Sequence, residues 1–199
     1  MSEIQSKPLS KNLGINSVGL ARAAFEDFLC RDLRTTVGRV HEDLFYHKIG
    51  VFVHLAECRT GRFRGTSAEV QANTHLYDGI IDTTLHAATE GAIGPKLTKK
   101  DVDNTRITLG LIDEVYTTTS PVEELEQDKS LIPIVDNSYL LPTIAQQYEW
   151  TAEEYLSRTY RKAQYNPRHW CDEPHVTLCK TRMFQESEGG SPVEVRLTK

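Results

Sequence analysis

The spacing of hydrophobic residues changes along the chain between helical and strand periods. Apolar residues recur at every third or fourth position over residues 17–33, which predicts an amphipathic helix. Residues 49–55 form a nearly continuous apolar run that predicts a buried strand, and residues 62–68 predict the strand that returns beside it. Between them, residues 59–61 predict a short turn with Gly61 in the left-handed conformation. A helix followed by a hairpin is therefore expected.

The same alternation continues to the end of the chain. Helical spacing, capping patterns and proline at the first helical position predict helices from 73 or 74 to 90, at 121–127, from Pro142 and at 151–164. Apolar runs predict strands at 106–112, 131–135, 175–184 and 193–197, with a capped turn at 98–101 and a final turn at 166–170. Together they predict an α+β fold: a mostly antiparallel sheet flanked by helices, with a smaller second lobe left open. We expect residues 1–14 to be a flexible tail and residues 15–199 to form the domain.

The composition is that of a folded protein with a buried core. The chain has 199 residues and a formal net charge of −5, a length that supports one domain or two small lobes. Four irregularly spaced cysteines argue against a disulfide framework and for a reducing compartment. No apolar run reaches the roughly 18 residues that a membrane helix needs. The first residues lack the apolar core of a signal peptide, so we expect a cytoplasmic protein without membrane association.

The charge is unevenly distributed. Residues 113–136 carry a net charge of −6, so the remainder of the chain carries +1. Two clusters of basic residues without an intervening acid stand out: Arg59, Arg62 and Arg64, and Arg158, Arg161, Lys162 and Arg168. The overall balance excludes a general nucleic-acid coat protein but leaves room for local anion sites.

The hairpin is the segment most suggestive of a ligand site. Arg62, Arg64, Gly65, Thr66 and Ser67 place two guanidinium groups, a bare glycine and two hydroxyls close together. Arginine suits carboxylate or phosphate because its planar fork donates two parallel hydrogen bonds, and a strand glycine marks a bulge or a close approach to the backbone. These five residues are candidate ligands for an anion. A half-buried strand with both arginines in solvent is the alternative that the pattern favours.

A nucleophile with its base is not evident in the sequence. His54 lies opposite Thr66 if the hairpin turn holds three residues, whereas a two-residue turn places Leu55 there. Cys58 is four strand residues from His54, roughly 13 Å, which is too far for direct activation. No catalytic residue is therefore assigned.

The C-terminal histidines and cysteines are weak candidates for a metal site. His169, Cys171, His175 and Cys179 lack the paired spacing of zinc knuckles, and the last two fall on one predicted strand. We predict no metal, and a Cys179 that is buried as a small hydrophobic residue.

Arg161 and Lys162 lie in the predicted helix 151–164 with Tyr155 and Tyr160. Aromatic rings interleaved with cations can stack bases and hold phosphates, so both cations are further candidate ligands. The two tyrosines follow helical spacing, which favours a buried side, and cations late in a helix also stabilise its dipole. Walker, Rossmann and RNA-recognition motifs are absent from the sequence.

Several separated motifs resemble the AMMECR-one domain family in the same order along the chain. They are Ile49–Leu55, Phe63–Gly65, Pro95–Thr98 before the strand at Arg106, Leu140–Trp150, and Arg161–Ala163 with Trp170. The resemblance extends from about Ser17 to the end of the chain. It implies one α+β domain without a nameable cofactor, and a family placed, as a prediction, with RNA modification.

The chain departs from this family at its most distinctive motif. The family reads Leu-Arg-Gly-Cys-Ile-Gly where this chain has residues 63–68, so Arg64 and Gly65 match while Thr66 replaces the cysteine and Ala68 the last glycine. This loss favours a non-catalytic binding or adaptor domain for a protein partner or an anionic ligand. The alternative is an enzyme, or an enzyme component, that acts on RNA or a phosphorylated small molecule. Convergence of the hairpin arginines with Arg161 or Lys162 on one pocket would favour an anion site.

Overall fold

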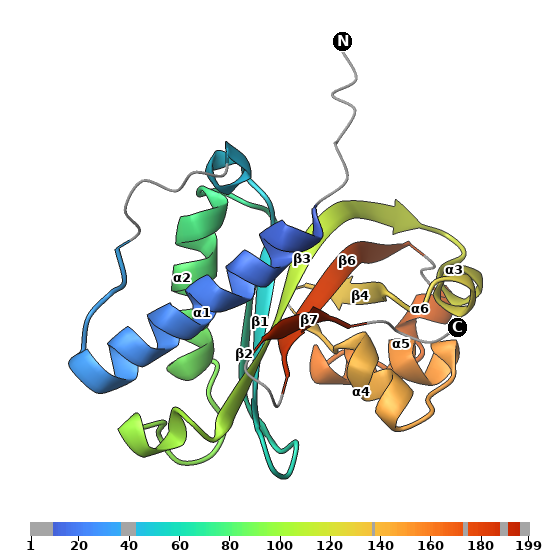
Figure 1. Ribbon diagram of the computed structural model, residues 1–199. Helices are drawn as coiled ribbons and strands as arrows, with labels where there is room; N and C mark the ends of the chain where they lie inside the picture. The colour runs from blue at the N-terminus through green and yellow to red at the C-terminus, as the bar shows by residue number, and fades with distance from the viewer. Residues whose placement is uncertain (1–9, 37–42, 137, 173–174, 188–190, 196–199) are drawn as a thin grey trace. The chain divides into compact units, whose positions relative to one another are not determined.

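The chain divides into two compact units in the computed structural model, which describes residues 10–36, 43–136, 138–172, 175–187 and 191–195 (Figure 1). Unit 1 comprises Met1–Leu111 and Met183–Val195, and unit 2 comprises Ile112–Arg182 and Arg196–Lys199. Two long strands, β3 (Thr105–Thr118) and β6 (Val176–Glu186), each contribute residues to both units.

Unit 1 is a sheet covered on one face by two helices. Its strands follow the order β2-β1-β3-β6, with β7 paired to the end of β6. The elements that lie wholly within unit 1 are α1 (Lys11–Arg31), η1 (Asp43–Tyr46), β1 (Val51–Glu57), β2 (Phe63–Glu69), α2 (Leu76–Ala88), η2 (Lys99–Asp101) and β7 (Pro192–Glu194). Helix α2 packs on α1, β1 and β2, so the helical layer lies against the first hairpin.

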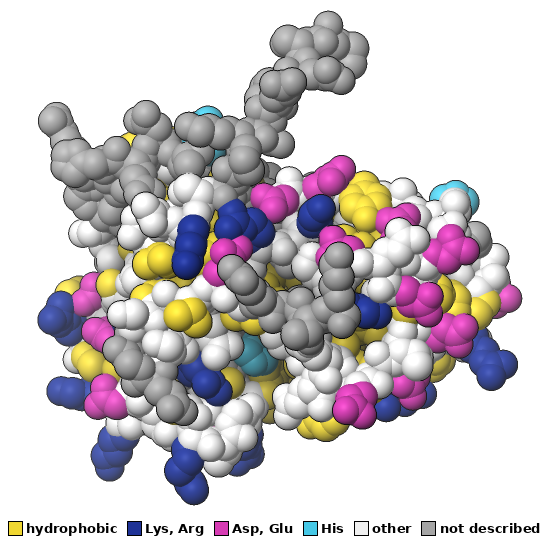
Figure 2. Space-filling view, turned by 45° about the vertical axis from the view of Figure 1, so that its right-hand side comes forward, with side chains coloured by type: hydrophobic (Ala, Val, Ile, Leu, Met, Phe, Trp, Pro, Cys, Tyr) yellow, Lys and Arg dark blue, Asp and Glu magenta, His cyan; other side chains and the backbone are white. Residues whose placement is uncertain are grey.

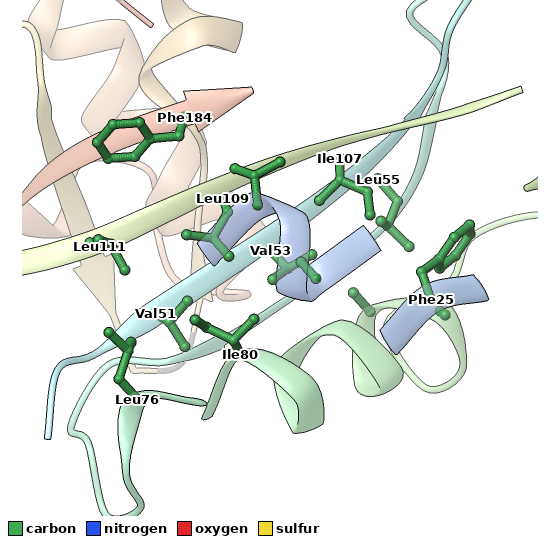
Figure 3. Packing of buried hydrophobic residues seen from close by; sticks show 14 of the residues in the cluster. Phe25, Val51, Val53, Leu55, Leu76, Ile80, Ile107, Leu109, Leu111 and Phe184 are labelled. Atoms are coloured by element: carbon green, nitrogen blue, oxygen red, sulfur yellow. The ribbon is translucent and has the colours of Figure 1, made fainter. Parts of the chain in front are cut away.

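The core of unit 1 forms between the strands and these helices. Val51, Val53 and Leu55 alternate along β1 and are fully buried. Val51 lies near Leu76 and Ile80 of α2, and Leu55 lies near Phe25 of α1, all of them also fully buried (Figure 3). The period of two in the strand and of four in the helix brings these apolar faces together. Burial of this apolar surface, at roughly 25 cal/mol per Å², is the main stabilising contribution to the unit.

Unit 2 contains the second half of β3, the first half of β6 and the remaining elements. Strands β6, β4 and β5 lie side by side, and helix α5 packs on β4, β5 and α3. The elements are α3 (Pro121–Gln127), β4 (Leu131–Val135), β5 (Ser138–Tyr139), α4 (Pro142–Gln147), α5 (Ala152–Lys162) and α6 (His169–Asp172). Tyr155 and Leu156 of α5 are buried against Leu131 and Leu178 in its core.

The architecture confirms the predicted fold class. Pairings β1–β2, β1–β3, β4–β5, β4–β6 and β6–β7 are antiparallel, and helices flank the strands, so the fold is α+β. Gly61 has φ of +68°, as the predicted turn requires. Helix 121–127 and strand 131–135 were predicted with correct bounds, and Thr151 caps α5 in a capping box with Glu154.

Several predicted boundaries were wrong for identifiable reasons. Helix α1 begins at Lys11 rather than Ser17, because Ser10 accepts a hydrogen bond from the Leu13 amide as its N-cap. Residues 11–14 are thus helical; residues 1–9 lie outside the described residues, and the tail and the boundary at 15 stay predictions. Helix α2 begins at Leu76 instead of near 73, because the Thr74 hydroxyl donates to the Glu69 carboxylate and the Asn73 side chain to the Gln71 carbonyl, so that neither caps a helix.

Strand β3 is twice as long as the predicted strand 106–112. The apolar run ends before Asp113 and Glu114, but both are exposed residues of a strand that continues to Thr118. Strand β6 extends two residues past the predicted end at 184, and β7 ends at Glu194; residues 196–199 lie outside the described part of the chain. The predicted turn at 166–170 contains the start of the short helix α6.

Candidate functional site

Gly65 is the point of closest approach between β2 and the end of α2. A Cβ placed on it would lie 2.1 Å from the carbonyl oxygen of Ala87, and one placed on Gly91 would lie 2.0 Å from the carbonyl oxygen of Thr66. Hydrogen bonds from the Thr66 amide to Gly91 (3.2 Å) and from the Ile93 amide to Arg64 (2.8 Å) hold the two segments together. A side chain at either position would clash with the backbone, so the two glycines allow these segments to pack closely.

Arg64 is the extra residue of a β-bulge and is 7% exposed. The register passes from Leu55 opposite Gly65 to Ala56 opposite Phe63, which leaves Arg64 without a partner across the hairpin. Its side chain turns toward the loop that precedes η2. One terminal nitrogen lies 3.5 Å from the carboxylates of both Glu57 and Asp101, and the other donates to the Pro95 carbonyl at 3.0 Å. Among the described residues its Nε has no hydrogen-bond partner.

Thr66, at the position of the family's motif cysteine, has its hydroxyl engaged with the backbone. The hydroxyl donates to the Val53 carbonyl at 2.9 Å. His54 lies opposite Thr66 in the register, one of the two predicted alternatives, but the bulge at Arg64 sets this register, since Glu57 pairs with Arg62 across a four-residue turn. The His54 ring stacks on Phe63 with centroids 5.1 Å apart. The Val53 carbonyl thus holds the Thr66 hydroxyl against β1.

Polar side chains lie opposite one another on three neighbouring strands of unit 1, starting from Thr66. Thr66 of β2, His54 of β1 and Thr108 of β3 are directly opposite one another, and the Thr108 hydroxyl lies 3.2 Å from the side-chain oxygen of Gln185 on β6. Sequence reasoning missed Thr108 and Gln185 because the pairing of β1 with β3 and the position of β6 depend on long-range topology. Ser67 is opposite Val53 and so is not one of these residues.

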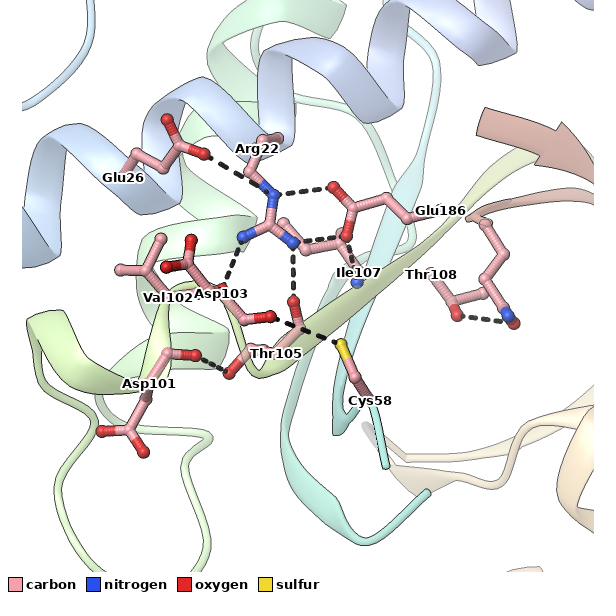
Figure 4. A network of polar contacts seen from close by, with 11 residues as sticks. Arg22, Glu26, Cys58, Asp101, Val102, Asp103, Thr105, Ile107, Thr108 and Glu186 are labelled. Atoms are coloured by element: carbon pink, nitrogen blue, oxygen red, sulfur yellow. Dashed lines mark hydrogen bonds and ion pairs between the residues drawn. The ribbon is translucent and has the colours of Figure 1, made fainter. Parts of the chain in front are cut away.

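A second polar network, centred on Arg22 of α1, fixes β3 and β6 of unit 1 (Figure 4). The Arg22 guanidinium forms a bidentate ion pair with Glu186 and donates to the carbonyls of Val102 (3.0 Å) and Thr105 (2.6 Å). Glu186 also accepts from the Ile107 amide at 2.8 Å. These charges neutralise one another, so the network has a structural role.

The C-terminal basic cluster lines a pocket in unit 2. The pocket has a volume of about 710 Å³, and its wall includes Arg158, Arg161 and Arg168 together with Trp170. The indole nitrogen of Trp170 donates to the Ser157 hydroxyl at 3.4 Å, which orients the ring. Within the part of the chain that the structure describes, none of the three arginines forms an ion pair.

The same pocket is also lined by acidic residues. Glu153 and Glu154 lie in the first turn of α5, and Asp172 lies in α6. One oxygen of Glu154 accepts from the Thr151 amide at 3.1 Å in the capping box. The lining of the pocket therefore combines guanidinium donors with carboxylate acceptors.

Lys162, the other predicted cation of α5, is engaged elsewhere in unit 2. Its ammonium donates to the Tyr139 carbonyl at 2.7 Å and lies 5.1 Å from the centre of the Tyr139 ring. Burial of the amine lowers the pKa of Lys162. Of the predicted ligands, the hairpin residues thus belong to unit 1 and Arg161 and Lys162 to unit 2; only Arg161 lines the arginine pocket.

The cysteines and histidines do not gather into a metal centre in the described residues, where no group of three or more potential ligands is close enough to hold an ion. His169 stacks on Tyr165 with centroids 5.8 Å apart, and Cys179 is buried. All four cysteines are free. Over the described ranges, no helix has both the length and the apolar character to span a membrane.

The fold and the motif order define a member of a family of α+β proteins. The AMMECR1 family model matches residues 18–184, and the chain therefore belongs to the AMMECR1 family. Protein VNG_2543C of Halobacterium salinarum is 30% identical over 98% of each chain, and Protein Mbar_A1807 of Methanosarcina barkeri is 28% identical over 88% of this chain and 91% of its own. These names state no activity.

A solved structure shares the fold. The crystal structure titled Uncharacterized Protein PH0010 from Pyrococcus horikoshii aligns with a TM-score of 0.83 and 23% identity, covering 95% of this chain and 99% of that one. The family predicted from the motifs is thus confirmed. At this identity the structural likeness carries the fold alone, so the function has to be argued from the chain's own residues.

Proposed function

We propose that this chain is a non-catalytic binding module whose pocket in unit 2 holds a phosphorylated small molecule. The observation that carries the proposal is the set of three arginines, Arg158, Arg161 and Arg168, lining one pocket without an ion pair in the described residues. Charge-assisted hydrogen bonds from guanidinium to phosphate are about twice as strong as neutral ones. Phosphate would supply the anionic partner that these three arginines lack among the described residues.

The carboxylates that line the pocket restrict the chemical class of the ligand further. Glu153 and Asp172 accept hydrogen bonds and repel a second anionic group. A ligand with one phosphate and several hydroxyl or amino groups would match both kinds of lining group. Ribose 5-phosphate has this chemistry and serves as the probe, and ribose is its control without the charge.

The engaged Thr66 hydroxyl supports binding rather than catalysis. It occupies the motif position of the family's cysteine and donates to the Val53 carbonyl. The buried Arg64 already faces two carboxylates, which leaves Arg62 as the exposed guanidinium of the hairpin candidates. Arg62, with Gly65, Thr66 and Ser67 beside it, stays the competing proposal for the anion site.

RNA is the second candidate ligand, favoured by an exposed aromatic stack in unit 2. Tyr148 is 63% exposed and stacks on Trp150 with centroids 5.7 Å apart, and Arg158 lies over the Trp150 ring at 4.3 Å. Single-stranded nucleic acid is held by rings that stack bases next to cations that meet phosphates. Such binding would depend on Tyr148, whereas a small phosphorylated molecule in the pocket would not.

The test follows the two tryptophan indole signals of the ¹⁵N-labelled protein by NMR, with Trp150→Phe to assign them. We expect ribose 5-phosphate, but not ribose, to shift the Trp170 signal, and Arg161→Gln to weaken binding by about tenfold, the loss of one charged hydrogen bond. Lys129→Gln, an equal change of charge at an exposed residue of unit 2 outside the pocket, is the matched control and should leave the affinity unchanged.

Three outcomes would overturn the proposal. No shift of Trp170 at any concentration of ribose 5-phosphate would exclude the pocket. Loss of affinity in Arg62→Gln but not in Arg161→Gln would move the anion to the hairpin. Polyuridylate binding that Tyr148→Ala abolishes, without binding of ribose 5-phosphate, would establish RNA as the ligand.

A further inference from the structure

The end of unit 1 that contains the β1–β2 turn and η2 is cationic although the chain is acidic. Residues 57–64 and 94–101 each carry a net charge of +2, against −5 for the whole chain. Including the flanking acids Glu90 and Asp103 still leaves +2 for the region. We call this surface the cationic end; its exposed cations are Arg59, Arg62, Lys96, Lys99 and Lys100.

Contacts within unit 1 bring these two segments together. Arg64 bridges Glu57 at the end of β1, Asp101 of η2 and the Pro95 carbonyl. The Cys58 amide donates to the Asn104 carbonyl at 2.8 Å, just beyond η2. Dark-blue lysine and arginine side chains gather at the lower left of Figure 2, where the β1–β2 turn and η2 lie in Figure 1.

The acids within the two segments are occupied by internal partners. Glu57 faces Arg64 and accepts from the Thr60 hydroxyl at 2.7 Å. Asp101 accepts from the Thr98 amide and hydroxyl at 2.8 Å, and these bonds, with Arg64, lower the pKa of Asp101 against the opposing effect of its burial. None of the five exposed cations forms an ion pair with another described residue. The charge left at the surface is therefore positive.

An exposed apolar side chain lies beside these cations. Ile93 is 57% exposed, and its amide donates to the Arg64 carbonyl at 2.8 Å. The Arg62 guanidinium lies next to the following residue, because a Cβ placed on Gly94 would be 4.0 Å from it. Among the described residues of unit 1, Tyr46 is the exposed tyrosine, and it contacts His75 at the start of α2. Helix α2 is about 20 Å long, and its other end leads to Ile93.

The combination of exposed cations with an exposed apolar side chain distinguishes between classes of anionic partner. Nucleic acid offers phosphates, and single strands also need exposed rings on which bases stack. Among the described residues of the cationic end, the one aromatic ring, that of Phe63, is half-buried and stacked on His54, whereas the neighbouring Ile93 is exposed. An acidic polypeptide provides carboxylates for the lysines and arginines and an apolar side chain for Ile93, so it complements both features.

We propose that the cationic end of unit 1 docks an acidic segment of another polypeptide, with an apolar side chain of that segment on Ile93 and carboxylates around it. The surface belongs to a different unit from the arginine pocket. The docking of a partner at this surface therefore does not require a ligand in the pocket of unit 2.

The test measures fluorescence anisotropy of a labelled peptide with the repeat Glu-Glu-Leu. We expect binding at about 50 mM NaCl that weakens strongly at about 300 mM, because screening shortens the range of the charges. Lys99→Glu should weaken binding about fivefold, since attraction is replaced by repulsion at an exposed site. Lys48→Glu, an exposed reversal near the start of α2 in the same unit, is the matched control and should change the affinity less than twofold.

A second set of measurements isolates the apolar contact and the class of partner. Ile93→Ser, or a peptide in which serine replaces leucine, should weaken binding about threefold, as expected for part of a buried aliphatic side chain. Equal effects of Lys99→Glu and Lys48→Glu would overturn the proposal. Displacement of the peptide by polyuridylate at lower concentration would assign the surface to nucleic acid instead. Self-association that Lys99→Glu abolishes would assign it to a second copy.

Discussion

Replacing Gly65 with alanine is expected to destabilise unit 1 severely. The new Cβ would lie 2.1 Å from the Ala87 carbonyl oxygen, a backbone atom that cannot rotate away. Ordinary contacts require roughly 3.5 Å, so β2 and the end of α2 would have to separate by more than 1 Å. That movement would break the hydrogen bonds from Thr66 to Gly91 and from Ile93 to Arg64.

The size of the effect can be worked from these contacts. Two lost backbone hydrogen bonds cost about 1 kcal/mol each, and forcing a methyl group into a packed site costs about 1–3 kcal/mol more. The free energy of unfolding should therefore fall by about 3–5 kcal/mol, a large part of the roughly 5–15 kcal/mol that a domain possesses.

Urea unfolding followed by circular dichroism measures this difference. Gly61→Ala is the matched control, because it lies in the same hairpin with open space around it and pays only the strain of its φ of +68°, about 1–2 kcal/mol. If Gly65→Ala unfolds at the same or a higher urea concentration than Gly61→Ala, the close approach at Gly65 does not exist and its packing role is refuted.

Three further changes have expected outcomes. Gly19→Ala, in an open part of α1, should raise the unfolding free energy by about 0.5–1 kcal/mol in the same urea assay, and a loss would show that the helix is wrongly placed there. Titration with a thiol reagent should label three cysteines rapidly (Cys30, Cys58 and Cys171) and Cys179 only on unfolding, because burial raises the pKa of that thiol to about 12. Because the folded pKa of Asp101 is lowered, its contribution to stability is complete above its unfolded pKa of about 3.9 and is lost as the pH falls through the folded pKa. Acid unfolding of Asp101→Asn should accordingly depend less on pH below about pH 4 than that of the parent.

Sequence patterns predicted most helices, strands and turns because these elements depend on residues that are close together in the chain. The turn with Gly61, the capping box at Thr151 and the helix starting at Pro121 depend on residues within a few positions of one another. The start of α2 was misjudged because the side chains of Thr74 and Asn73, which look like caps, donate to the Glu69 carboxylate and to the Gln71 carbonyl instead. Side-chain competition of this kind becomes visible only when the end of a neighbouring strand is in place.

The candidate site was less accessible to sequence reasoning for the same reason. Arg64 looked like a surface cation by strand alternation, yet the bulge turns it toward Glu57 and Asp101. Arg161 was predicted as a ligand with its basic neighbours, but the pocket that they line with Trp170 depends on the turn between α5 and α6. Its acidic residues were not anticipated, because Glu154 reads in sequence only as part of a capping box.

The short segment that follows α2 has a further consequence for the behaviour of the protein in concentrated solution. Strand β2 ends the strand order of unit 1, and an unpaired strand at that position is a template for pairing with other chains. Residues 91–93 occupy its outer hydrogen-bonding groups at Arg64 and Thr66, and Gly65 forms a bridge with Ala92. Gly65→Ala is expected to displace residues 91–93 and so to expose this sheet edge. Aggregation by strand addition would then be the earliest effect of the substitution in this motif.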